Sequence, residues 1–477
     1  MPAPVEAILV GAGSRGRDTY GAYALAHPDR IRFVAVAEPH PIRRARLAEA
    51  HGISPARQFE TWQDLIGTGQ LAQAAVIATQ DAMHVDPTIA ALRAGYDVLL
   101  EKPMAVTLAG CVRLVHVAEE TGHLLQISHG LRYTPFFSAV HDLIASDRLG
   151  RVIAVEHREN VSYWHMAHSY VRGHWRNRAS AGPMILTKCC HDLDLLYWFL
   201  GSCERISSTG ALTHYRPENA PPGAPARCTD GCPYADACPW YAPRLYLDLV
   251  PLLQVARGSQ NLVERLGATL ALDYPTLTRW LRRLVPAADA MIDYRGWPIS
   301  VLSEDTSPAA RMQALEQGPY GRCVYHCDND VVDQQTVSMT LASGASAVLV
   351  MHGHSHEEGR TLRIDGSRAT LRGRYTLDRQ EIELHDHHTG RVQRIQIRQP
   401  VRDATGHGGG DAGLIDAFVA AVQGHSPPPT TARASLESHL MAFAADEARL
   451  QRSIIDMEGY RQQAEAMVAH QDKGELG

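Results

Sequence analysis

The first 128 residues alternate short apolar runs with amphipathic segments. The apolar runs predict strands at 6–10, 32–37, 74–78, 96–100 and 123–127. The segments between them have helical spacing and predict helices near 16–26, 41–51, 61–66, 84–93 and 107–121. Alternation of this kind is typical of a parallel sheet covered by helices on both faces. We therefore expect an α/β domain over residues 1–128.

From residue 129 onward, polar and apolar residues begin to alternate one by one. The pattern predicts one helix and then four strands, at 133–145, 151–157, 331–341, 346–351 and 359–364. Strands of this type suit an antiparallel sheet with one covered face. We expect an α+β domain with an open, mostly antiparallel sheet over 129–424.

An insertion at 214–325 interrupts the second domain. It begins with a segment rich in proline, glycine and cysteine and continues with helical spacing from Leu249 to Met291. The chain then ends in two helical segments, 411–423 and 433–470. We expect residues 425–477 to pack back on the first domain.

Composition narrows the class of protein. The chain has 477 residues, of which 45% are hydrophobic and 21% charged, and its net charge is −6. No basic surface for nucleic acid is expected, and no apolar run approaches the roughly 20 residues that span a bilayer. The first residues lack the layout of a secretory signal. We expect a cytoplasmic protein that binds neither nucleic acid nor membrane.

A glycine-spaced turn follows the first strand, and its spacing predicts a dinucleotide site. Gly11 permits a tight turn, Gly13 lets a phosphate approach the backbone, and Gly16 lets the next helix pack against the strand. That helix begins near Ser14 and Arg15, where free N–H groups favour an anion.

An acid at the end of the second strand bears on the choice of cofactor. Glu38 lies 22 residues after Gly16, where an acid binds the ribose hydroxyls of NAD. Arg15, Arg43 and Arg44 lie close in sequence, so NADP stays an alternative. We expect NAD to be preferred.

Glu101-Lys102-Pro103 follows the fifth strand, at the edge of the sheet where ligands bind in open α/β folds. A lysine there can hydrogen-bond a substrate hydroxyl and help to remove its proton. The alternative is an ordinary surface ion pair.

These motifs resemble the Gfo/Idh/MocA oxidoreductase family. The matching segments are Gly11–Gly16, Thr79–His84, Glu101–Pro103 and His191–Asp194. The resemblance implies a Rossmann domain that binds NAD or NADP and a second domain whose open sheet carries the substrate and often the oligomer contact. A homodimer or homotetramer is therefore expected. It also implies further cofactor contacts, which we assign to Thr79, Asp81, His84, Glu101 and Lys102.

His191 begins an amphipathic helix, and Asp194 lies on the same side of that helix. By the resemblance, His191 faces the substrate carbon that gives up hydride, and Asp194 supports it. A core histidine bonded to a carbonyl is the alternative. Many family dehydrogenases carry an aspartate four residues before this histidine, where this chain has Thr187. Lys188 follows, and it is expected either to assist Lys102 or to bind an anionic group of the substrate.

A segment dense in aromatic, histidine and arginine residues runs from Glu159 to Arg176. Flat apolar faces combined with planar polar groups suit the binding of a sugar. The alternative is a loop packed by its own aromatic side chains. The predicted substrate-binding residues, besides His191, are Arg132, Tyr133, Tyr163, Trp164, His165, His168, Arg172 and Trp175.

Nine cysteines, an odd number, favour reduced thiols or metal ligands over a disulfide framework. Cys228, Cys232 and Cys238 lie within eleven residues of the insertion. They are candidates for zinc, with Cys323, His326 or Cys327 as a fourth ligand, or for an iron–sulfur cluster. The spacing fits no common zinc finger, and buried free thiols are the alternative.

The leading hypothesis is an NAD-dependent oxidoreductase that oxidises a secondary hydroxyl of a sugar, sugar derivative or cyclitol. The first alternative is a redox glycosidase that oxidises, eliminates, hydrates and reduces while it retains NAD. The second alternative is a protein that binds NAD without turnover. The presence of both Lys102 and His191 argues against that second alternative.

Overall fold

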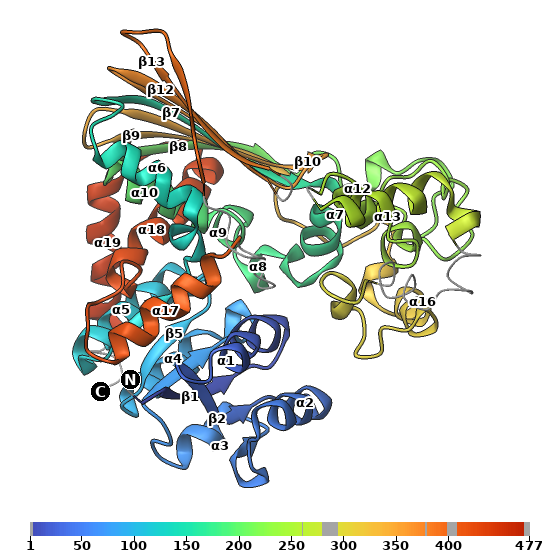
Figure 1. Ribbon diagram of the computed structural model, residues 1–477, viewed down its shortest axis with the longest axis horizontal. Coiled ribbons are helices and arrows are strands. Elements are labelled where there is room, and N and C mark those ends of the chain that lie inside the picture. Colours follow the sequence, from blue (N-terminus) through green and yellow to red (C-terminus); the bar gives the residue numbers. More distant parts are fainter. Residues whose placement is uncertain (1–2, 260, 279–293, 377–378, 398–407, 472–477) are drawn as a thin grey trace.

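A computed structural model describes residues 3–259, 261–278, 294–376, 379–397 and 408–471. Three parts are visible in Figure 1. The amino-terminal domain is blue, a second domain built on a large sheet lies above it, and a green and yellow lobe stands to one side. The red carboxyl-terminal helices run between the first two parts.

The first domain contains a six-stranded parallel sheet in the order β3-β2-β1-β4-β5-β6. Its strands are β1 (Val5–Val10), β2 (Ile31–Ala37), β3 (Gln58–Phe59), β4 (Ala74–Ile77), β5 (Asp97–Leu100) and β6 (Leu125–Ile127). The five predicted strands are confirmed as β1, β2, β4, β5 and β6. The sequence missed β3, which has two residues. The order reverses at β1, and ligands of such sheets bind at this point of reversal.

Helices cover this sheet in the predicted places. They are η1 (Arg15–Gly21), α1 (Ala22–Ala26), α2 (Pro41–His51), α3 (Trp62–Gly67), α4 (Val85–Arg93) and α5 (Leu108–Thr121), with the short turn η3 (Asp81–Met83) after β4. Thr107 caps α5 by accepting a hydrogen bond from the Gly110 N–H. The Rossmann arrangement of the first domain is thereby confirmed.

The second domain contains a nine-stranded sheet in the order β14-β13-β12-β11-β7-β10-β9-β8-β15. The pair β7 and β10 is parallel and the other pairs are antiparallel, so the predicted mostly antiparallel sheet is confirmed. The strands are β7 (Val152–Ser162), β8 (Cys203–Ala211), β9 (Gln334–Leu341), β10 (Ser346–Ser355), β11 (Gly359–Gly366), β12 (Ala369–Thr376), β13 (Gln380–Asp386), β14 (Val392–Ile395) and β15 (Ile454–Asp456).

One face of this sheet packs on helices, as Figure 1 shows for α6 (Pro135–Ala145) and α10 (Cys190–Leu200). Alternate residues of the central strands are buried, which is what one covered face requires. Short helical segments connect the sheet to the first domain and to the lobe. They are η4 (Gly130–Tyr133), α7 (Tyr163–His165), η5 (Met166–Arg172), η6 (His174–Arg176), α8 (Arg178–Ala181) and α9 (Met184–Thr187).

The insertion, residues 214–325, forms the separate lobe of Figure 1 and is called the lobe below. Its helices are α11 (Ala242–Tyr246), α12 (Val250–Arg257), α13 (Leu262–Asp273) and α16 (Pro308–Gln317). The lobe has its own apolar cluster, which includes Leu245, Ile299 and Leu315. The predicted helical stretch up to Met291 is confirmed for α12 and α13, and residues 279–293 lie outside the described residues.

The carboxyl-terminal segment forms α17 (Gly410–Val422), α18 (Ala432–Gln451) and α19 (Met457–Gln471). The helical segment predicted at 433–470 contains two helices, α18 and α19, with a short strand between them. Arg452 adopts a left-handed conformation with φ of 54°, which ends α18, and β15 then pairs with β8 before α19 begins. Helix α18 packs against α5 of the first domain and against α10 and β8 of the second.

Helix α17 completes the core of the first domain. Its residues Leu414, Ile415, Phe418 and Val419 are buried in one cluster with residues of β1 and β2. Tyr23 of α1 donates a hydrogen bond to Asp416 of α17 at 2.6 Å. This helix lies within the segment that the sequence assigned to the second domain. Among the residues that the structure describes, no helix is both long enough and apolar enough to cross a bilayer.

We expect Phe418→Ala to lower the free energy of unfolding by about 3–5 kcal/mol, because a fully buried aromatic side chain leaves a cavity in the first domain. Leu450→Ala is the control, since Leu450 is 55% exposed and its removal should change stability by less than about 0.5 kcal/mol. Urea unfolding followed by circular dichroism measures both. Equal effects of the two substitutions would contradict a core role for α17.

Candidate active site

The glycine turn after β1 has the geometry of a phosphate-binding loop. Gly11 has a φ of 95°, and a Cβ there would lie 2.6 Å from the Ala78 carbonyl oxygen. A Cβ on Gly16 would lie 2.0 Å from the Gly11 carbonyl oxygen. At Gly13 a Cβ would meet no atom within 4 Å. Backbone packing therefore requires two of the glycines, and the third faces the space that a pyrophosphate needs. Ser14 and Arg15 lead directly into η1.

Glu38 is fixed beside this turn at the end of β2. Its carboxylate accepts hydrogen bonds from the Ala12 N–H at 2.7 Å and from the His40 N–H at 3.0 Å. The side chain is buried. The carboxylate thus lies at the carboxyl end of β2, where the ribose of a dinucleotide is bound in this fold.

The basic residues near Glu38 are engaged elsewhere. The Arg43 Nε donates to Glu304 of the lobe at 2.6 Å. The Arg44 guanidinium donates to the Glu38 and Pro39 carbonyl oxygens. Arg43 and Arg44 therefore already have hydrogen-bond partners within the protein.

Arg15 points into the protein and joins three segments of the chain. Its guanidinium donates to Glu101 at 2.6 Å and forms two hydrogen bonds with Asp411, at 3.0 and 3.1 Å. Tyr20 donates a further hydrogen bond to Glu101 at 2.7 Å. Burial alone would raise the pKa of Glu101, but the Arg15 charge and the Tyr20 hydrogen bond hold it below its usual value. Arg15 and Glu101 thus fix the turns around the cofactor position.

Lys102 is held at the carboxyl edge of the sheet by a backbone carbonyl. Its Nζ donates to the Thr187 carbonyl oxygen at 3.1 Å. The Thr187 hydroxyl bonds to the carbonyl oxygens of Pro183 and Met184 in its own helix. Thr187 stands where many family dehydrogenases carry an aspartate. Its backbone carbonyl therefore orients Lys102, and the Thr187 side chain is turned away from Lys102.

Three buried histidine rings, those of His129, His191 and His439, form a cluster near Lys102. The rings of His129 and His191 have centroids 5.5 Å apart, and those of His129 and His439 are 5.7 Å apart. Burial, followed by the charges of Arg132 and Lys102, holds the pKa of His129 well below its usual value. Burial likewise lowers the pKa of His439 to about 3, with smaller effects from His129 and Lys102. The rings of His129 and His439 are therefore neutral near pH 7.

Asp194 orients Arg132 in a buried pair. The two side chains form a bidentate interaction with both N–O distances at 2.6 Å. His129 Nε2 lies 3.9 Å from the same carboxylate. Tyr133 bonds through its hydroxyl to Thr430 at 3.0 Å. Arg132 is thus paired with Asp194 and Tyr133 with Thr430, and their contact with substrate stays a prediction.

Lys188 lies in a buried network of charges and is not a free cation. Its Nζ is 2.9 Å from Glu358 and 3.2 Å from Glu159. Arg360 pairs with Glu159 at 2.7 Å and with Asp192 at 2.9 Å. Burial opposes the charge of Lys188, but Glu358 and Glu159 raise its pKa above the usual value. Lys188 is thus protonated and neutralised, which disfavours both of its predicted roles, as a proton acceptor and as an anion site.

Two predicted substrate residues close to this network, His165 and Tyr163, have partly exposed side chains. His165 Nδ1 is hydrogen-bonded to Glu358 at 2.9 Å. Glu358 also accepts hydrogen bonds from the N–H and hydroxyl of Ser162. The Tyr163 hydroxyl donates to Gln254 of the lobe at 3.2 Å. The side chains of His165 and Tyr163 stay candidates for contact with substrate.

Other predicted wall residues are structural. Trp164 is buried in the apolar cluster of the lobe. His168 is 2% exposed and bonds to the Tyr246 hydroxyl at 2.8 Å. These two positions are corrected, because their side chains hold the lobe against the second domain.

The turn after β4 links the two domains. The Trp175 Nε1 donates to Asp81 at 2.8 Å. His84 Nδ1 donates to the Pro103 carbonyl oxygen at 2.7 Å, and the Thr79 hydroxyl donates to the Met83 carbonyl oxygen at 3.2 Å. His84 is fully buried and so supports the Lys102 turn without reaching a ligand. Thr79, Asp81 and Trp175 are partly exposed and stay candidate contacts.

The metal prediction for Cys228, Cys232 and Cys238 is not supported. Across the described ranges of the chain, no three His, Cys, Asp or Glu side chains are arranged to hold a metal ion. The cysteines in these ranges are free thiols.

The physical reason is the side chain of Arg172. This guanidinium is 1% exposed and lies 3.6 Å from the Cys228 Sγ. It donates to the carbonyl oxygens of Arg322 and Trp240, both at 2.7 Å. A buried cation already lies among the thiols, and it ties the loop to the second domain. Arg172 therefore has a structural role, which also corrects its assignment to the substrate wall.

Several residues of the site were missed by the sequence analysis. Glu159 was within the segment singled out, but it was not assigned a role. Asp192 was likewise part of the His191–Asp194 motif, and its contact with Arg360 joins α10 to β11. Asp411 and Glu358 belong to no motif, because their partners are far away in sequence. His129 follows the strand predicted at 123–127, and it also belonged to no motif that the sequence showed.

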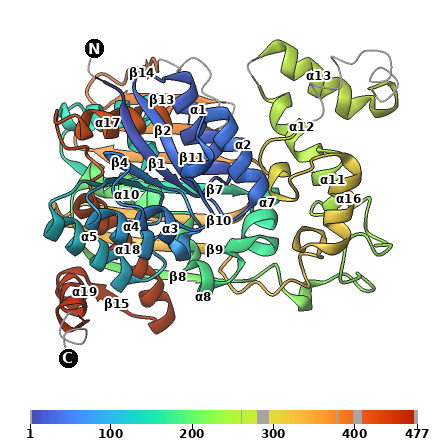
Figure 2. The same cartoon turned by 90° about the horizontal axis from the view of Figure 1, so that it is seen from below.

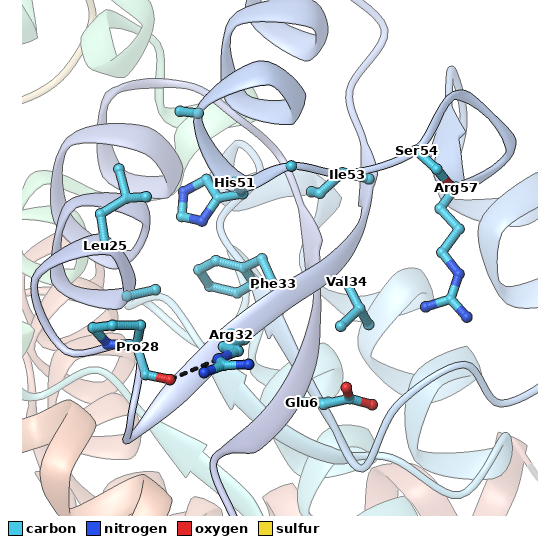
Figure 3. Close-up of a pocket in the computed structure, with 13 residues that line it drawn as sticks. Glu6, Leu25, Pro28, Arg32, Phe33, Val34, His51, Ile53, Ser54 and Arg57 are labelled. Atoms are coloured by element: carbon cyan, nitrogen blue, oxygen red, sulfur yellow. Dashed lines mark hydrogen bonds between the residues drawn. The ribbon is translucent and has the colours of Figure 1, made fainter.

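A surface hollow of about 550 Å³ lies away from these residues (Figure 3). Phe33, His51 and Ile53 line it, together with Glu6 and Arg32 near the amino ends of β1 and β2. The Arg32 Nε donates to the Pro28 carbonyl oxygen there. Because ligands of this fold bind at the carboxyl ends of the strands, we do not assign the reaction to this hollow.

Comparisons with known proteins agree with this geometry. A family model described as "Oxidoreductase family, NAD-binding Rossmann fold" matches residues 5–129, and one described as "GFO/IDH/MocA C-terminal domain" matches residues 137–229. The 1,5-anhydro-D-fructose reductase of Ensifer adhaerens is 34% identical over 142 residues, which are 29% of this chain and 40% of that protein. Inositol 2-dehydrogenase 2 of Saccharopolyspora erythraea is 30% identical over 138 residues, 28% of this chain and 37% of that protein.

The chain thus matches about 40% or less of the length of these curated relatives. Among solved structures, levoglucosan dehydrogenase in complex with NADH and levoglucosan superposes with a TM-score of 0.63 at 15% identity. That likeness covers 95% of this chain and 99% of the other. At this identity it shows the shared fold.

We expect Arg172→Met to loosen the cysteine-containing loop, because the hydrogen bonds to Trp240 and Arg322 are lost and the thiols become accessible. The rate at which a chromogenic disulfide reagent labels Cys228 should rise about tenfold or more, as a buried hydrogen-bonded network opens. Arg216→Met is the control, since that side chain is exposed. Unchanged labelling of Cys228 in Arg172→Met would show that the guanidinium does not hold the loop.

Proposed function

Because the chain carries both domains of the Gfo/Idh/MocA oxidoreductases and belongs to that family, we propose that it oxidises a secondary hydroxyl of a sugar, sugar derivative or cyclitol with NAD. The observation that carries the proposal is the position of Lys102. Its ammonium is fixed by the Thr187 carbonyl at the carboxyl edge of the sheet, beside a cluster of neutral histidines that includes His129 and His439.

The described residues fit a bound dinucleotide. Gly13 leaves room for the pyrophosphate, and Glu38 is fixed for the ribose hydroxyls. Thr79 and Asp81 lie on the turn that follows the next strand, β4. When bound, NAD supplies the hydride acceptor. The alcohol then loses hydride and a proton and becomes a ketone, so the overall reaction yields NADH and one proton.

In this proposal the protein holds the hydroxyl and removes its proton. Lys102 forms a hydrogen bond with the substrate hydroxyl, and the neutral amine form of Lys102, together with His191, accepts the hydroxyl proton as hydride leaves. Asp194 acts behind them, by fixing Arg132. His165 and Tyr163 contact the remaining hydroxyls of the substrate.

A redox glycosidase is the second candidate, and Thr187 favours it. A backbone carbonyl there holds Lys102 without adding a negative charge, so the acid–base pairing differs from that of the simplest family dehydrogenases. Production of NADH from a panel of free sugars and cyclitols supports the first candidate. Cleavage of an aryl glycoside without net NADH supports the second, and NAD binding with neither reaction would leave the non-catalytic hypothesis.

We expect Lys102→Ala to reduce turnover about 10²–10⁴-fold while NAD affinity stays nearly unchanged, because the lysine contacts the reacting hydroxyl and not the pyrophosphate. Lys102→Met, which keeps the apolar stem, should lose as much. Turnover is followed by NADH absorbance and NAD affinity by calorimetry. Near-normal turnover in either variant would remove Lys102 from the mechanism.

We further expect NAD to bind at least about tenfold more tightly than NADP, since Glu38 repels a 2′-phosphate and a like-charge contact costs upward of 1 kcal/mol. Isothermal titration calorimetry with each nucleotide measures the ratio. Tighter binding of NADP would overturn this assignment of Glu38.

A further inference from the structure

A carboxylate of the lobe bridges two arginines of the nucleotide-binding domain. Glu304, in the segment before α16, lies 2.6 Å from the Nε of Arg43 and 2.9 Å from a terminal nitrogen of Arg46. Both arginines belong to α2. Figure 2 shows the lobe beside α2 in the view from below. The Glu304 side chain is 17% exposed, whereas the two arginines are 37% and 49% exposed.

Further basic groups of the first domain lie close to the same carboxylate. Burial alone would raise the pKa of Glu304, but the hydrogen bond from Arg43 and the charges of Arg43, His40 and Arg46 hold it below the usual value. The charge of Glu304 also contributes to the raised pKa of Arg17, after the Asp18 hydrogen bond. Glu304 is therefore an ionised carboxylate in a basic environment.

These basic groups flank the glycine turn on both sides. Arg17 lies on η1, directly after Gly16, and His40 and Arg43 follow Glu38 within five residues. Tyr294 of the lobe also lies near η1, since the charge of Asp18 contributes to its raised pKa after burial. The lobe thus meets the two elements between which the adenosine end of a dinucleotide is bound.

Arg43 and Arg46 of α2 carry the guanidinium groups that can bind a 2′-phosphate. In dinucleotide-binding domains an acid after the second strand selects NAD, whereas an arginine nearby accommodates the phosphate of NADP. In this chain the acid is present as Glu38, but so are Arg43 and Arg46. Without Glu304, two unpaired guanidinium groups would adjoin the ribose position and attract the phosphate.

We infer that Glu304 is a determinant of cofactor specificity. The lobe supplies this carboxylate, which pairs with Arg43 and Arg46 and so excludes NADP. Glu38 alone would discriminate less between NAD and NADP. This inference rests on the proposed use of NAD. The inference gives the lobe a role in the cofactor site, although the lobe is an insertion in the second domain.

The test measures nucleotide binding and requires no substrate. In Glu304→Gln we expect the affinity for NADPH to rise about three- to tenfold, as two partly exposed ion pairs are released, and the affinity for NADH to change less than about twofold. Quenching of protein fluorescence gives both dissociation constants. Glu316→Gln, at an exposed position of α16 in the same lobe, should leave both constants unchanged.

A second variant separates charge pairing from a general loosening of the lobe. In Glu304→Gln combined with Arg43→Gln and Arg46→Gln, the gain in NADPH affinity should disappear, because the groups that attract the phosphate are gone. An NADPH affinity that does not change in Glu304→Gln, or a gain that persists in the triple variant, would overturn the inference while NADH binding stays intact. Failure of the unmodified protein to bind NADH would instead overturn the proposed function, and the inference with it.

Discussion

The guanidinium of Arg15 is the interaction on which the geometry of the cofactor region depends. It connects the first residue of η1, the carboxylate that precedes Lys102, and the amino end of α17. The single positive charge of Arg15 offsets part of the negative charge of Glu101 and Asp411, two carboxylates that would be costly to bury without it. The glycine turn, the lysine turn and the carboxyl-terminal helix are thereby fixed in one arrangement. Positions of η1 and of Lys102 cannot vary independently while this cluster is intact.

A second set of buried charges performs the same task in the other domain. Lys188 and Arg360 lie among Glu159, Glu358 and Asp192, and the pairs join β7, β11 and the start of α10. Such a network positions neighbouring groups more than it adds stability, because desolvation offsets much of the attraction. Its outer member is His165, whose ring is fixed through Glu358. The polar side of the candidate substrate region is therefore preorganised before any ligand arrives.

Sequence patterns predicted those features that depend on neighbours along the chain. The glycine turn, Glu38 and Lys102 each follow a strand whose apolar run is evident, and their places at the sheet edge follow from the fold. Asp411 could not be found in this way, since it pairs with Arg15 across 396 residues. Glu358 pairs with Lys188 across 170 residues. The close spacing of the cysteines suggested a metal. The cation that organises their loop, Arg172, could not be recognised from the sequence, because it lies 56 residues before Cys228.

The return of α17 to the first domain has a consequence for the order in which the chain acquires structure. Strands β1 and β2 are synthesised early, yet one apolar face of their sheet is covered by Leu414, Phe418 and their neighbours. During translation that face is covered only in part, by residues of η1, α1 and α2 in the same cluster, until more than 400 residues have emerged, and contacts of such sequence separation form slowly. The nascent amino-terminal half therefore exposes apolar side chains that α17 buries in the folded protein. A fragment ending near residue 128 would carry the same defect permanently.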